Sequence, residues 1–167
     1  MMCIRCGLCC DGSLFDDVEL VSPVESAGLE VMGLDVDEGD GDPDSAQLVQ
    51  PCGALQGKRC GIYAYRPECC RTFECRLLQD ARRGAVSVQQ ALKHIAQAVK
   101  QVGHVRKLAA DLGQRNERLS LKERCLEALA MSAETATTPA LTRKRAQLQA
   151  EMAAVEGLIQ NTFLGNR

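Results

Sequence analysis

Cysteine is the residue type in this sequence whose number and spacing point to chemistry. Nine of the ten cysteines lie between Cys3 and Cys75, in two tight groups. Clusters of this kind bind metal far more often than they form a set of inert buried thiols. We therefore predict that the two groups build one metal centre, with the chain between them looped out. The first group is Cys3, Cys6, Cys9 and Cys10, and the second is Cys52, Cys60, Cys69, Cys70 and Cys75.

The first group has the spacing C-x2-C-x2-C-C, which suits metal binding. Two residues between cysteines let both thiolates reach one metal while backbone N–H groups point at the sulfurs. Gly7 permits a tight turn between them because it has no side chain to clash. Adjacent Cys9 and Cys10 pose a geometric problem, since neighbouring side chains tend to diverge. This favours two metal sites, or one site plus a spare thiol, and leaves open which of the two is a ligand.

The donor atoms restrict the choice of metal. Both histidines, His94 and His104, lie beyond the cysteine-rich part, so a site built within positions 1–80 has thiolate ligands with at most an occasional carboxylate. Soft sulfur donors select Zn²⁺, Cu(I) or an iron–sulfur cluster. A tetrahedral site of four cysteines suits zinc, and four thiolates also suit iron–sulfur clusters. The two histidines are about 15 Å apart along one predicted helix, so they cannot share a metal.

Charge and composition differ between the two ends of this 167-residue chain. Residues 1–80 hold 6 Lys/Arg against 15 Asp/Glu, whereas residues 81–167 hold 14 against 7. No apolar run approaches the roughly 20 residues that span a bilayer, and no signal-peptide pattern follows the first Met. We therefore expect a cytoplasmic protein without a membrane segment. In that reducing compartment, clustered cysteines bind metal or do redox chemistry rather than form structural disulfides.

We predict a mainly α fold in two parts. Residues 1–80 form a small, irregular, cysteine-rich metal-binding region, and residues 81–167 form a helical hairpin or bundle. The helical region packs on the cysteine-rich region or on a second copy of itself. An acidic stretch at 35–44 matches a calcium-binding EF-hand loop poorly, so we interpret it as a solvated loop.

The helical part carries clear start and stop signals. Side chains that cap a helix N-terminus precede three stretches of apolar residues repeating at threes and fours. A glycine follows the first stretch, as is typical of a helix C-terminus. The signals are Ser87 with Gln90, Ser120 with Glu123, Thr138 before Pro139, and Gly113.

Signals in the cysteine-rich part are weaker. Asp16 or Asp17 could cap a short helix that continues to Val21. A second helix could start at Ser22-Pro23, with Val24, Ala27 and Val31 on one face. A third could follow Pro67 and carry Cys70, Phe73 and Leu77 on one side, while Tyr63 and Tyr65 cover a small core.

The basic charges of the helical part could suggest a nucleic-acid partner. They are mixed with acidic residues, however, and the aromatic side chains that stack on bases are missing. We therefore expect a solvated helix face and no nucleic-acid binding. The helical part is better suited to bind a protein partner or a second copy of the chain than to bind nucleic acid.

Two patterns together resemble the CxxCxxCC family of zinc- or iron-chelating cysteine-cluster proteins. They are C-x2-C-G-x-C-C at the N-terminus and PC-x7-C-x-IY-x2-RP-x2-CR-x-F-x-C further on, and both fall within positions 1–80. Flagellin lysine N-methylases carry a similar cluster. The resemblance implies metal binding by eight cysteines and leaves Cys69 and Cys125 as extras. The eight are Cys3, Cys6, Cys9, Cys10, Cys52, Cys60, Cys70 and Cys75.

Two functions are compatible with these residues. The first is a metal-binding protein that coordinates zinc or iron through its thiolates. The alternative is an iron–sulfur enzyme of the redox or methyl-transfer type, similar to the flagellin lysine N-methylases. In either case Arg66 and Arg71, which lie among the cysteines of the second group, would stabilise negative charge on sulfur or simply pair with Asp and Glu. In a third interpretation the helical part is an interaction module and the metal only anchors it.

Overall fold

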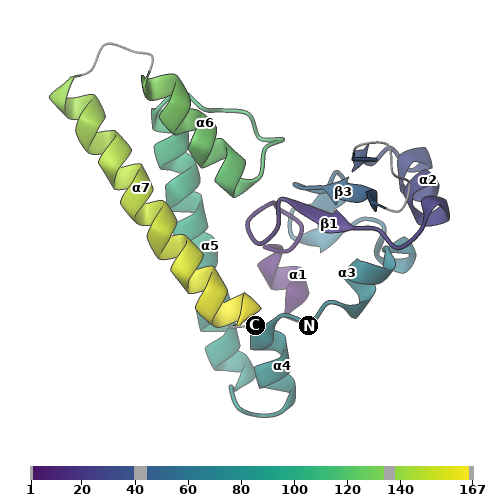
Figure 1. The fold of residues 1–167 in the computed structure, drawn as a ribbon. Coiled ribbons are helices and arrows are strands. Elements are labelled where there is room, and N and C mark those ends of the chain that lie inside the picture. The colour runs from purple at the N-terminus through teal and green to yellow at the C-terminus, as the bar shows by residue number, and fades with distance from the viewer. Residues whose placement is uncertain (1, 40–44, 134–137, 166–167) are drawn as a thin grey trace. The chain divides into compact units, whose positions relative to one another are not determined.

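The computed structural model describes residues 2–39, 45–133 and 138–165. It separates into two compact units, Cys3–Glu74 and Cys75–Arg167 (Figure 1). Short helices and strands make up the first unit and long helices make up the second. The predicted mainly α class, with an irregular cysteine-rich part followed by a helical bundle, is confirmed. Residues 40–44 of the predicted acidic loop lie outside the described residues.

The first unit contains two small antiparallel sheets and several short helices. One sheet has the strand order β1-β3-β2, with Leu48 of β3 paired to Val18 on one side and Val36 on the other. The other is a β4–β5 hairpin whose two-residue turn starts at Gly57, with φ of 63°. Glycine is favoured there because the first residue of such a turn needs a positive φ. The elements are α1 Cys3–Cys6, β1 Asp17–Glu19, α2 Pro23–Val31, β2 Val36–Asp37, β3 Gln47–Val49, β4 Leu55–Gln56, β5 Arg59–Cys60, η2 Tyr63–Tyr65 and α3 Glu68–Thr72.

Three sequence predictions for this unit are wrong in part. The helix expected before Val21 is strand β1, because Val18 pairs with Leu48 in the sheet. Helix α2 does start at the Ser22 cap, but its predicted apolar face is reversed: Val24 is 83% and Val31 89% exposed. The two tyrosines of η2 are exposed rather than covering a core.

A small apolar cluster holds the first unit together. It consists of side chains from the first sheet, α2 and the adjoining loops. Cys52 and Cys69, two members of the second cysteine group, pack against it together with Val36 and Ile62. The cluster therefore fixes parts of the cysteine-rich segment by ordinary hydrophobic contact. Its buried members are Leu20, Leu29, Leu34, Ala46, Leu48 and Ala54.

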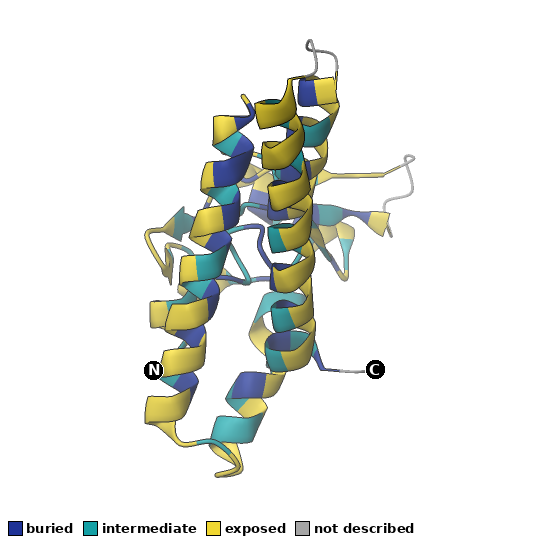
Figure 2. Cartoon of the chain, turned by 90° about the vertical axis from the view of Figure 1, so that its left-hand side faces the viewer, coloured by how far each residue is buried: buried dark blue, intermediate teal, exposed yellow. Residues whose placement is uncertain are grey.

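The second unit is a bundle of long helices. Helices α5 Val88–Asp111, α6 Leu121–Ala133 and α7 Pro139–Ile159 all pack against one another, and α7 continues into one π-helical turn, η3 Gln160–Leu164. The shorter α4, Arg76–Arg82, packs on α5 and on that turn. Buried residues recur along the long helices between exposed ones (Figure 2), which is the stripe that the sequence pattern predicts.

Local capping explains why the helices start where they do. The Ser87 hydroxyl accepts from the Gln90 N–H while the Gln90 side chain accepts from the Ser87 N–H, the predicted capping box. Ser120 and Glu123 make the same pair before α6. Thr138 caps α7 through the N–H of Leu141. All three predicted helix starts are confirmed.

The third predicted helix, after Pro67, is divided in two. Helix α3 ends at Thr72, α4 begins at Arg76, and the residues between them are not helical. The Phe73 ring at this break packs edge-on against Phe15, with ring centroids 5.1 Å apart. The aromatic contact therefore takes Phe73 away from the helical path that its spacing predicted.

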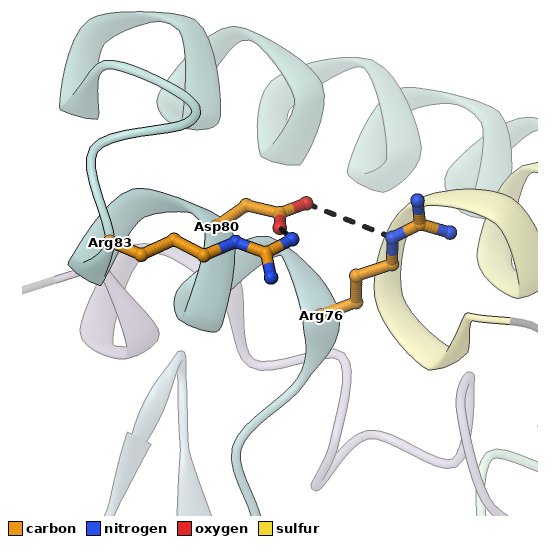
Figure 3. Close-up of polar contacts among 3 residues, drawn as sticks. All are labelled: Arg76, Asp80 and Arg83. Atoms are coloured by element: carbon orange, nitrogen blue, oxygen red, sulfur yellow. Dashed lines mark hydrogen bonds and ion pairs between the residues drawn. The ribbon is translucent and has the colours of Figure 1, made fainter.

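Asp80 joins α4 to the turn that leads into α5. Arg76 and Arg83 flank its carboxylate (Figure 3): the Arg76 Nε lies 3.7 Å from Asp80 Oδ2, and the Arg83 Nη2 contacts Oδ1. The Asp80 carbonyl also accepts from the N–H groups of Ala85 and Val86. Exposed ion pairs contribute little on their own, so the backbone bonds are the firmer part of this connection.

Both histidines are exposed on α5, and His104 Nε2 lies 4.0 Å from Glu151 Oε1 of α7. The two histidines lie on one helix, as the sequence predicts. Among the described residues, no helix combines the length and the apolar character needed to cross a membrane.

Two valines of α5 test the packing of the bundle. Val102 is 2% exposed and Val88 is 60% exposed. Val102→Ala should lower the free energy of unfolding by about 2 kcal/mol, because it removes buried methyl groups and leaves a cavity. Val88→Ala, the matched control, should change it by less than about 0.5 kcal/mol. Denaturant unfolding followed by helical circular dichroism measures both, and equal losses would contradict the packing described.

Because of Cys125, the stability of the bundle should depend on pH in the alkaline range. This residue is buried in α6, and burial raises its thiol pKa from 9.0 to about 11. The folded state therefore favours the neutral thiol, so this contribution to stability is complete below pH 9 and is lost as pH rises through about 11. Between pH 8 and 11, the free energy of unfolding should fall more steeply for the wild-type chain than for Cys125→Ala. Parallel pH profiles would show that Cys125 is not the group responsible.

Candidate metal centre

Backbone and side-chain hydrogen bonds connect the two cysteine groups. The Cys52 N–H donates to the Cys10 carbonyl over 2.9 Å, which joins positions far apart in the sequence. Lys58 Nζ, in the β4–β5 turn, donates to the Arg5 carbonyl of α1 over 3.1 Å. Helix α1 therefore packs beside β5, the strand that carries Cys60. Contrary to the sequence prediction, the segment between the two groups is not simply looped out: it forms β1, α2, β2 and β3 and most of the apolar cluster against which two cysteines of the second group pack.

Gly7 shapes the first group. Its φ of 79° turns the chain directly after α1, and its carbonyl accepts from the N–H groups of Cys10 and Asp11. The next residue, Leu8, is almost fully buried and anchors the turn. Local backbone bonds and one apolar anchor therefore set the direction in which Cys9 and Cys10 leave α1.

Gln50, the β4–β5 hairpin and α3 position the second group. The buried Gln50 side chain accepts from the Cys52 N–H over 3.1 Å, alongside the bond to Cys10. Hairpin pairing sets Cys60 opposite Leu55. Helix α3 then carries Cys69 and Cys70, whose Sγ atoms are 3.9 Å apart.

Four of the predicted ligands are close enough for their charges to interact: Cys10, Cys52, Cys60 and Cys70, here called the four-thiol group. Burial raises the pKa of the Cys10 thiol from 9.0 to about 12, with further increases from Cys52, Cys60 and Asp11. Burial likewise raises the pKa of Cys52, and the nearby Cys60 adds to the increase. Each thiolate that forms therefore makes its neighbours harder to ionise, unless a cation enters the group.

Cys69 adjoins the four-thiol group. Its hydrogen bond with Cys70 lowers the pKa of Cys69 and, together with burial, raises the pKa of Cys70. The charges of Cys10 and Cys52 also raise the pKa of Cys70, so its sulfur lies near thiols of both cysteine groups. Sequence reasoning left Cys69 out of the ligand set, and its position directly before Cys70 was the signal available.

The other four predicted ligands lie in other elements. Cys3 begins α1 and is exposed, Cys6 ends α1, and Cys9 lies in the turn that follows. Cys75 is the N-cap residue of α4 and lies at the start of the second unit. All ten cysteines are thiols rather than disulfides. Within the described ranges, no group of three or more His, Cys, Asp or Glu side chains is already arranged to hold a metal ion.

The two arginines beside the second group differ in their contacts. Arg66 donates from Nη1 to the Cys70 carbonyl over 3.2 Å and from Nε to the Tyr63 carbonyl over 3.1 Å. Its guanidinium lies 3.8 Å from the Tyr63 ring centroid, and its charge lowers the pKa of Cys10. Arg71 is exposed on α3. Arg66 is thus the arginine that acts electrostatically on the four-thiol group.

The donor chemistry fits a soft metal ion. The group consists of half-buried thiols, and a cation would offset the burial and the mutual repulsion that raise the pKa of Cys10 and of Cys70. Coordination would require these thiols to turn toward one common point. These features define a thiolate-based metal-binding domain.

The comparison with protein families agrees with this class. The sequence model named CxxCxxCC, "Putative zinc- or iron-chelating domain", matches residues 2–90, which is more than half of the chain. The protein therefore belongs to the CxxCxxCC family, and its cysteine-rich part is a metal-binding domain. No curated protein and no solved structure matches the chain.

Two glycines test how strongly the turn after α1 is constrained. Gly7→Ala places a side chain at φ of 79°, which costs about 1–2 kcal/mol, so the first unit should lose about that much stability. Gly28→Ala is the matched control, because it lies inside α2 with nothing within 4 Å of the added Cβ. That change should stabilise the unit by about 0.5–1 kcal/mol. Chemical unfolding measures the free energy of unfolding of both variants and of the wild-type chain. A gain in stability for Gly7→Ala would contradict the turn geometry.

Proposed function

We propose that this protein binds zinc or iron through clustered cysteine thiolates in the cytoplasm. The observation that carries the proposal is that thiols of both cysteine motifs lie close enough for their charges to interact, beside the backbone bond that joins Cys52 to Cys10. The remaining ligands would be the other cysteines of the two motifs. The complete proposed set is Cys3, Cys6, Cys9, Cys10, Cys52, Cys60, Cys70 and Cys75.

The protein's own residues would prepare these thiols for metal. The raised pKa of Cys10 and Cys70 means that an incoming ion displaces protons, so affinity should weaken as pH falls. The charge of Arg66 favours the thiolate of Cys10 and so partly offsets the free energy needed to remove its proton. We assign Arg71 the weaker role of adding positive charge beside the second group. A bound ion would supply neutralising charge and a fixed geometry to the thiolates.

Metal would also stabilise the fold. The apolar cluster of the first unit is small for a unit of this length, so hydrophobic burial alone gives a modest stability. Structural zinc contributes on the order of 10–16 kcal/mol in small peptides. We therefore assign metal binding to residues 1–80. The helical residues 81–167 would act as a scaffold that packs on this region, on a second copy or on a protein partner.

Serine substitutions test the ligand assignment. Cys60→Ser and Cys75→Ser should each reduce bound metal and destabilise the cysteine-rich region, because a hydroxyl is a poor replacement for a thiolate. Cys125→Ser is the control for metal content, since Cys125 lies on α6 in the helical bundle. Metal content by elemental analysis and thermal unfolding of the full chain give the result. Full metal content with unchanged stability in both variants would exclude these two residues as ligands.

A second candidate is an iron–sulfur enzyme of the redox or methyl-transfer type, similar to the flagellin lysine N-methylases. The all-thiol donor set favours it as well, because four thiolates hold iron–sulfur clusters. Protein purified without oxygen separates the two candidates. Iron with inorganic sulfide and reversible bleaching on reduction would support the enzyme, whereas a colourless zinc protein would support a structural or metal-handling role.

A further inference from the structure

We propose that Cys69 is a metal ligand in addition to the eight cysteines of the family signature, and that it binds the same ion as Cys70. The inference rests on the proposed metal-binding function and extends it, because the motif residues that carry the family resemblance do not include Cys69. It gives the second cysteine group a pair of ligands from one short helix.

The separation of the two sulfurs carries the proposal. Cys69 Sγ and Cys70 Sγ are 3.9 Å apart. Two thiolates that share a tetrahedral zinc ion, each with a Zn–S bond of about 2.3 Å, are about 3.8 Å apart. Adjacent side chains on a helix normally point in directions about 100° apart and diverge. This pair instead lies at the spacing of two corners of one coordination tetrahedron.

Contacts along α3 hold the pair in that position. At its start, the Glu68 N–H donates to the Glu25 carboxylate of α2 over 2.7 Å. The Arg66 guanidinium holds the Cys70 carbonyl, and the Phe73 N–H donates to the Cys69 carbonyl over 3.0 Å. Fixing the backbone on both sides lowers the conformational entropy that the pair would lose on binding an ion.

The surroundings of the pair also favour a ligand. Cys69 packs with Cys52 against the apolar cluster, and Cys52 is joined to Cys10 by the backbone bond between the two motifs. Cys69 is half-buried, so it is not enclosed in the core. A cysteine with only a packing role would be replaceable by alanine without effect on metal.

Cobalt binding to the full-length protein tests the proposal, because thiolate-to-cobalt absorption reports the number of Co–S bonds. The variants are Cys69→Ala, Cys70→Ala and the control Cys125→Ala. In a site of four thiolates, Cys69→Ala should lower this absorption per bound cobalt by about a quarter, as Cys70→Ala does. Competition with a chelator should show affinity at least roughly tenfold weaker. Cys125→Ala should match the wild-type chain.

The outcomes separate this inference from the proposed function. If the wild-type chain and Cys69→Ala bind cobalt with the same absorption and affinity while Cys70→Ala is impaired, Cys69 is not a ligand and the proposed function stands. If the wild-type chain takes up neither cobalt, zinc nor iron, both fail. Should Cys69→Ala not fold, alkylation of the wild-type chain decides: zinc should protect Cys69 from iodoacetamide, and equal labelling with and without zinc overturns the inference.

Discussion

The hydrogen bond from the Cys52 N–H to the Cys10 carbonyl is the constraint on which the site depends. It joins two cysteine motifs that the sequence separates by a long acidic segment. Gln50 accepts from the same N–H, so a buried side chain reinforces the connection. The bond from Lys58 Nζ to the Arg5 carbonyl and the buried Leu8 attach the first motif at two further points.

The two units are stabilised by different physical effects. The helical unit buries a regular stripe from each long helix and caps each start with side-chain hydrogen bonds. The cysteine-rich unit has short strands, turns and one small apolar cluster. Its half-buried thiols at Cys10 and Cys70 have raised pKa values, partly because neighbouring thiolates repel them, and a shared cation would offset that repulsion. This contrast explains why the chemistry is concentrated in the less regular unit.

Local signals allowed the helical unit to be predicted closely. The Ser87–Gln90 box and the Thr138 cap lie next to the helices that they start, so the sequence alone locates them. The cysteine-rich unit was predicted less well because its structure depends on distant partners. Val18 became a strand residue through pairing with Leu48, and α2 turned Val24 outward because Leu29 joins the apolar cluster.

The candidate site shows the same division. Motif spacing identified Cys10 and Cys70 as candidate ligands, but which thiols meet depends on the fold between the motifs. Cys69 was left out because it lies outside the family pattern, whereas α3 brings its sulfur close to that of Cys70.

Hydrogen exchange of the full chain, with metal bound and after chelation, tests the central claim most directly. If thiolate–metal bonds hold the cysteine-rich unit together, chelation should speed exchange throughout Cys3–Glu74, including the Cys52 amide, and leave the long helices unchanged. A metal-loaded sample in which amides of both units exchange at the same rates before and after chelation would contradict the account.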